Sequence, residues 1–123
     1  MKLAEAITRA DEVKPNDFPE SDKRRWLSEL DHKIYEEIIK THEGGEDVEY
    51  SGYDEDTPGD TVLLAADAYA EIYPAWLMAK IDLHNAEIAK YNNSIIEFNA
   101  LYQAFERWYN RTHMPKSAKI RYY

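Results

Sequence analysis

The sequence predicts an all-α protein: a small bundle of about four helices with a central helical hairpin and a long acidic loop. The first observation is that large apolar residues between positions 69 and 114 recur every three or four residues, or seven where His84 intervenes, as on one helical face. The second is that only residues 61–64 resemble a strand, and no second run could pair with them. Because 123 residues fit one domain, we expect a single helical domain over residues 1–123.

Two helices are expected in the first third of the chain. Residues 2–13 have apolar side chains on one face, and Pro15 ends this helix because its ring cannot continue the hydrogen-bond ladder. The second helix should begin within residues 19–22, where acidic side chains favour the positive end of the helix dipole. It should run to about His42, because Gly44-Gly45 is typical of a helix C-terminus.

Residues 43–60 are expected to form an acidic surface loop. They read EGGEDVEYSGYDEDTPGD, with eight acids, no bases, four glycines and one proline. Asp54, Asp56 and Gly59 partly match a calcium-binding EF-hand loop, but Pro58 occupies the fifth position and Ala65 the twelfth, where a bidentate Glu belongs. The sequence therefore does not predict an EF-hand.

The central pair of helices is expected between residues 67 and 111. The third helix should begin between Asp67 and Pro74 and end near Tyr91. Asn92-Asn93 would form a tight turn, and Ser94 to Glu97 has the S-x-x-E form of a capping box that would start a fourth helix over residues 95–111. The alternative is one continuous helix of ~40 residues and ~60 Å, because the apolar spacing continues through the asparagine pair.

The apolar faces of these helices predict the core, with the first two helices covering the central pair. The expected core residues are Trp26, Leu30, Ile34, Leu77, Ile81, Ile88, Ile95, Phe98, Tyr102 and Phe105.

Composition excludes several classes of function. The net charge of −9 disfavours a general nucleic-acid or anionic-membrane binder, and the lack of cysteine excludes disulfides and Cys-ligated zinc. No two histidines have metal-ligand spacing, and His84 with Glu87 gives only one reversed copy of a di-iron motif. No nucleophile elbow, Walker loop or dinucleotide fingerprint is present. We therefore expect no enzyme activity, catalytic residue, metal or cofactor.

Neither end of the chain suggests a membrane protein. The N-terminus is charged and lacks the apolar core of a signal peptide, and no apolar run approaches the ~20 residues of a membrane span. A cytoplasmic location is therefore expected.

The C-terminal segment has the opposite charge from the rest of the chain. Five bases and no acids lie between Arg107 and the end, and a short basic tail covers residues 115–123. Trp108, Tyr109 and two terminal tyrosines accompany them, as in sites that bind phosphate and stack bases. Because Arg107 to Arg111 should lie on a helix with a buried side, a partner-docking or solubilising role is favoured over direct nucleic-acid binding.

Three segments resemble a known group of proteins. They are WLSELD, AKIDLHNAEIAKYNNS and FERWYNRTHMPK, within residues 26–31, 79–94 and 105–116. They resemble small helical head–tail connector or head-completion proteins encoded in the head modules of tailed phages and Gram-positive prophages. The resemblance implies an all-helical adaptor that forms a ring below the portal and joins capsid to tail at the virion neck after assembly in the cytoplasm. It implies no catalytic activity and no cofactor.

The expected partners are therefore other copies of this chain and phage portal or tail proteins. A ring requires two different surfaces on each subunit, so we expect the acidic loop of one copy to lie near the basic segment of its neighbour, although both could instead be solvated independently. The alternative function is an acidic helical regulatory or protein-binding module. The candidate partner-binding residues are Glu46, Asp47, Glu49, Asp54, Glu55, Asp56 and Asp60 on the loop, and Arg107, Arg111, Lys116, Lys119 and Arg121 near the C-terminus.

Overall fold

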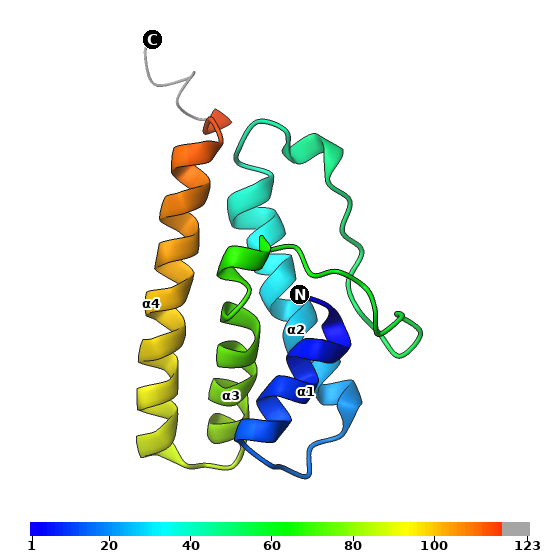
Figure 1. The fold of residues 1–123 in the computed structure, drawn as a ribbon, viewed down its shortest axis with the longest axis vertical. Coiled ribbons are helices and arrows are strands. Elements are labelled where there is room, and N and C mark those ends of the chain that lie inside the picture. Colours follow the sequence, from blue (N-terminus) through cyan, green and yellow to red (C-terminus); the bar gives the residue numbers. More distant parts are fainter. Residues whose placement is uncertain (117–123) are drawn as a thin grey trace.

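The computed structural model describes residues 1–116 and confirms the all-α fold class (Figure 1). Its helices are α1 (Leu3–Val13), α2 (Glu20–Ile34), α3 (Ile72–His84) and α4 (Ile88–Thr112). Short helical turns cover Tyr35–Ile39, Gly45–Asp47 and Asp67–Tyr69. Within these residues the only β-type pairings are isolated bridges of Lys2 with Val62 and of His42 with Pro115, so the near-extended segment after the acidic loop forms no sheet.

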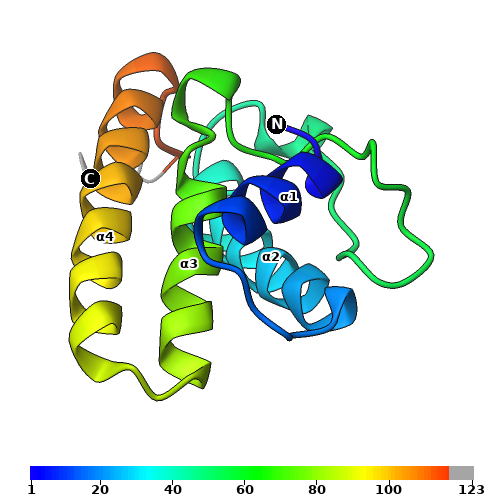
Figure 2. The same cartoon turned by 60° about the horizontal axis from the view of Figure 1, so that its bottom comes forward.

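Helix α3 is the centre of the bundle. It packs against α4 on one side and against α1 and α2 on the other, as Figures 1 and 2 show from two directions. Of the two helices predicted to form the central pair, only α3 is central, because α4 lies at the edge of the molecule. All four helices contribute to one cluster of buried side chains, which includes Leu3, Leu27, Leu77 and Phe105.

The C-terminal end of α2 is followed by a single π-helical segment, Tyr35–Ile39, in which Lys40 N donates to Tyr35 O (2.9 Å). The predicted stop at Gly44-Gly45 then reverses the chain. Gly44 has a φ of +89°, which glycine adopts without strain. A Cβ at Gly45 would lie 2.0 Å from Ile39 O, so only glycine fits there.

The predicted turn at Asn92-Asn93 is wrong, and so is the alternative of one continuous helix. The hairpin exists, but α3 ends at His84 and Ala86 makes the turn with a φ of +57°. Helix α4 then runs through both asparagines, which are exposed. The cost of Asn inside a helix, about 0.7 kcal/mol or less per residue, is smaller than the gain from packing α4 against α3.

The predicted capping box is also wrong, because Ser94 lies within α4. Its Oγ donates to Asp82 Oδ2 on α3 (2.6 Å) and so links the two helices instead of starting one. Asp82 also accepts from Lys14 Nζ (2.6 Å), which joins the end of α1 to the same carboxylate.

The predicted core is confirmed except at the start of α4. Ile88 is 57% exposed and Ile95 is only partly buried. The apolar spacing places Ile88 on the same helical face as Ile81, but the turn between α3 and α4 separates the two residues and breaks that spacing. No helix of residues 1–116 has the length and apolar character needed to cross a membrane.

Candidate protein-interaction surfaces

The acidic loop is anchored to the bundle by one buried carboxylate. Asp31, on α2, is fully buried and accepts hydrogen bonds from Tyr53 Oη (2.5 Å), Tyr73 Oη (2.6 Å) and Leu64 N (3.1 Å). Tyr73 Oη in turn accepts from Ala65 N (2.7 Å). One side chain of α2 therefore fixes the loop, the segment that follows it and α3.

Burial dominates the electrostatics of this cluster. It raises the pKa of Asp31, although three hydrogen bonds to the carboxylate act in the opposite direction. Burial and the nearby Asp31 carboxylate also raise the pKa values of Tyr53 and Tyr73, so both hydroxyls remain protonated donors at neutral pH. These tyrosines act as structural partners of Asp31.

The tip of the loop is ordered by Arg24 of α2. Arg24 Nη1 donates to Asp54 O (2.8 Å) and to Thr57 O (2.6 Å). Asp54 Oδ1 accepts from Asp56 N (2.9 Å) and Thr57 N (3.1 Å), which closes the turn. This segment, residues 54–60, is called the acidic turn below.

The predicted acidic residues divide into three groups. Asp54 is used within the acidic turn, and Glu46 pairs with Lys116 Nζ (3.2 Å). Hydrogen bonds and this pairing lower the pKa of Glu46. The remaining carboxylates are exposed and form no ion pair within residues 1–116; they are Asp47, Glu49, Glu55, Asp56 and Asp60.

The start of the loop and the end of the described chain meet within one subunit. Lys116 N donates to Thr41 O (2.8 Å), and Glu43 N donates to Met114 O (2.8 Å). His42 is buried beside them, with Nε2 at 2.7 Å from Asn110 Oδ1 of α4. Lys116 therefore has a partner in its own chain, which the sequence did not predict. Lys119 and Arg121 lie outside the described residues.

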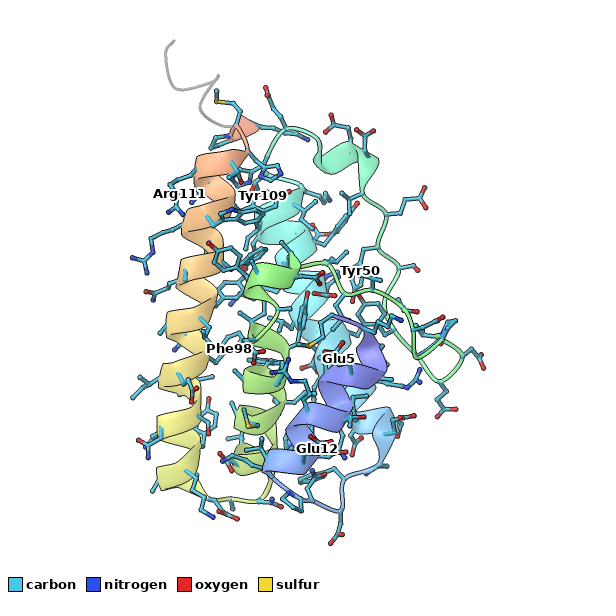
Figure 3. The ribbon with its side chains drawn as sticks, in the orientation of Figure 1. Glu5, Glu12, Tyr50, Phe98, Tyr109 and Arg111 are labelled. Atoms are coloured by element: carbon cyan, nitrogen blue, oxygen red, sulfur yellow. The ribbon has the colours of Figure 1, made fainter. Side chains whose placement is uncertain are left out.

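The outer face of α4 is the second surface. Arg107 and Arg111 are exposed and form no ion pair within the described chain, and Figure 3 shows Arg111 on the outer edge of the molecule. Towards the N-terminus of the helix the exposed charged residues Lys90 and Glu97 lie along one margin of this face. Its centre consists of exposed uncharged residues at helical spacing: Ala89, Asn92, Asn93, Ile96, Asn99, Ala100 and Gln103.

The anchors of the acidic loop were missed at the sequence level, although a signal exists. Asp31 falls in the same helical stripe as Leu27, Leu30 and Ile34, and a carboxylate inside an apolar stripe indicates a buried hydrogen-bonded group. Its partners Tyr53 and Tyr73 carry no such signal, because their contacts depend on the path of the loop.

No group of His, Asp or Glu among residues 1–116 has the arrangement of a metal site. Comparisons with protein-family models, curated proteins and solved structures gave no match.

Proposed function

We propose that this protein is a structural adaptor of a phage or prophage neck, which joins the portal or capsid to the tail as an oligomeric ring. The observation that carries the proposal is the placement of two surfaces at opposite edges of the bundle. The acidic turn lies at one edge and the free face of α4 at the other (Figures 1 and 2). A subunit with different surfaces on opposite edges can assemble head to tail, and such assemblies close into rings when the rotation permits.

The resemblance to phage connector proteins is the reason for placing this adaptor in a phage neck. The all-helical fold agrees with the fold that the connector resemblance implies, and the segments that carry the resemblance lie in α2, α3 and α4. Neck proteins work by contact between subunits, and ordered, exposed surfaces suit that role.

Co-expression with the portal protein of the same source tests this function. We expect the two proteins to copurify, and electron microscopy of the complex should show a ring. A protein that stays monomeric and ignores the portal at all concentrations and salt conditions would refute the proposal.

A second candidate function is an acidic module that binds a basic partner. The favouring observation is the acidic turn, whose exposed carboxylates Glu55, Asp56 and Asp60 project from a backbone held by Arg24. Ordered acids bind a basic surface with less entropic cost than a mobile loop would.

Neutralising the acidic turn distinguishes this candidate. Deleting the loop is unsuitable, because Tyr53 holds the buried Asp31. The variant Glu55→Gln, Asp56→Asn, Asp60→Asn keeps the size of each side chain and should lose a basic partner. Binding that survives the triple substitution would exclude this function.

A further inference from the structure

The outer face of α4 has a distinctive charge pattern in a strongly acidic chain. From Ala89 to Gln103 the centre of this face is uncharged, with the exposed Lys90 and Glu97 along one margin, and Arg107 and Arg111 follow one turn apart. The glutamates of α4 nearest to this face, Glu97 and Glu106, lie roughly a quarter turn to either side. The face is therefore neutral and then basic, whereas the whole chain has a net charge of −9.

These arginines are also unusual in having no carboxylate partner. Most described Lys and Arg side chains form ion pairs, such as Arg9 with Glu71 and Lys80 with Glu29. Arg107 instead donates from Nε to Gln103 O in its own helix (3.3 Å), and neither Arg107 nor Arg111 has an ion pair within residues 1–116. Two adjacent guanidinium groups thus remain available for carboxylates from outside.

The complementary charge lies on the far edge of the same molecule. Glu55, Asp56 and Asp60 are exposed on the acidic turn, which Arg24 and the side chain of Asp54 hold in one conformation. Figures 1 and 2 place this turn and α4 on opposite sides of the bundle, so one copy cannot join its own two surfaces.

We propose that the outer face of α4 binds the acidic turn of a second copy of this chain, with Arg107 and Arg111 paired to Glu55, Asp56 and Asp60. The contact is heterologous: each copy uses its acidic turn to contact one neighbour and its α4 face to contact another. Ile96, which is 66% exposed, and the small residues beside it supply apolar area on the accepting face. This inference rests on the oligomeric part of the proposed function and requires no portal protein.

Sedimentation velocity of the purified full-length protein tests the contact. At an ionic strength of ~0.01 M, where the screening length is ~30 Å, wild type should associate with rising concentration, and ~0.15 M salt should weaken the association. The variant Arg107→Glu, Arg111→Glu should weaken it by at least about tenfold, because pairing becomes repulsion. The matched control Lys2→Glu, Lys33→Glu makes the same charge change at two exposed lysines outside α4 that, like the two arginines, form no ion pair within residues 1–116, and it should change association less than about threefold.

A charge exchange identifies the surface that binds α4. Reversal of Glu55, Asp56 and Asp60 to Lys should abolish self-association, and mixing this variant with the α4 double variant should restore a complex. Restored assembly supports the proposed contact. A wild type that is monomeric at low salt overturns it. Association that is lost on reversal of the arginines but unaffected by reversal of the acidic turn also overturns it and indicates α4-to-α4 pairing. Copurification with a portal is measured separately, so failure there leaves this result standing.

Discussion

Replacing Asp31 with Ala should destabilise the protein by about 2–4 kcal/mol at pH 7. The substitution removes the acceptor of three hydrogen bonds, so the buried O–H of Tyr73 and N–H of Leu64 lose their acceptor, although Tyr73 Oη still accepts from Ala65 N. Each buried donor left unsatisfied costs about 1–3 kcal/mol. Tyr53 is only partly buried and can turn towards water, and removing a desolvated charge offsets part of the loss.

Urea unfolding followed by far-UV circular dichroism measures this loss. Asp31→Asn is the matched variant, because it keeps the size and one acceptor oxygen and should lose less than the Ala variant. A loss below ~0.5 kcal/mol for Asp31→Ala would refute the role of Asp31 as the anchor, since surface substitutions already vary by that amount.

The pH dependence of the same comparison follows from the raised pKa of Asp31. The pKa of Asp31 in the folded protein lies above its value of ~3.9 in the unfolded chain. The contribution of Asp31 to the free energy of unfolding is therefore complete at a pH below the unfolded pKa and is lost as the pH rises through the folded pKa. Wild type should therefore gain stability relative to Asp31→Asn as the pH falls from about 7 to 4. A difference between the two proteins that does not change with pH would contradict the effect of burial on Asp31.

Three further substitutions test the fold, and urea unfolding measures each. Phe98→Ala should cost about 2–5 kcal/mol because the ring is buried between α4 and α3. Ile96→Ala on the exposed face should cost under ~0.5 kcal/mol, and equal losses for the two variants would show that the buried face of α4 is misassigned. Gly45→Ala should cost ~1–3 kcal/mol because the new methyl meets the Ile39 carbonyl, and a neutral result would mean that this turn can shift freely. Ser94→Ala should cost ~1 kcal/mol through the lost bond to Asp82, while Glu97→Ala should be near neutral; a similar cost for both would revive the capping box.

The sequence predicted the helices well, because their signals are local. Pro15 ends the first helix: α1 stops at Val13, two residues before it. Leu30, Ile34 and Phe98 lie on apolar stripes that the structure buries. Spacing of this kind reports directly which side of a helix leaves water, so it needs no knowledge of the partner helix.

The position of the hairpin turn was not predictable in the same way. Asn85-Ala86-Glu87 has neither Gly nor Pro, and Ala86 adopts a left-handed conformation that alanine rarely occupies. Asn92-Asn93 gives a stronger local signal for a turn, but the chain keeps it helical. Packing between α3 and α4 outweighs that local preference, and packing cannot be read from one segment.

Which of the candidate charged residues are free to bind a partner also depends on tertiary contacts. Glu46 and Lys116 were expected in surfaces of neighbouring copies, yet they pair in one chain because the loop begins where α4 ends. Glu46 and Lys116 are 70 positions apart in the sequence, so the sequence alone does not indicate that they pair. The sequence identified the acidic loop and the basic segment, whereas the structure shows which charges already have partners.

The order of the acidic turn leads to a last prediction, which concerns association. Arg24→Met removes the two hydrogen bonds that tie the turn to α2, together with the ion pair of Arg24 with Glu20, but alters none of the carboxylates of the turn or the α4 face. Ordering a loosened turn on binding costs free energy, so self-association should weaken by about three- to tenfold at low salt while the helical circular dichroism signal is retained. Arg25→Met is the matched control, because Arg25 is the neighbouring residue, pairs with Asp22 and makes no hydrogen bond to the turn within the described chain. The two variants have the same net charge, so sedimentation velocity of both separates order from charge. Equal association of the two would mean that the carboxylates act by charge alone and that the hold of Arg24 on the turn has no part in the contact.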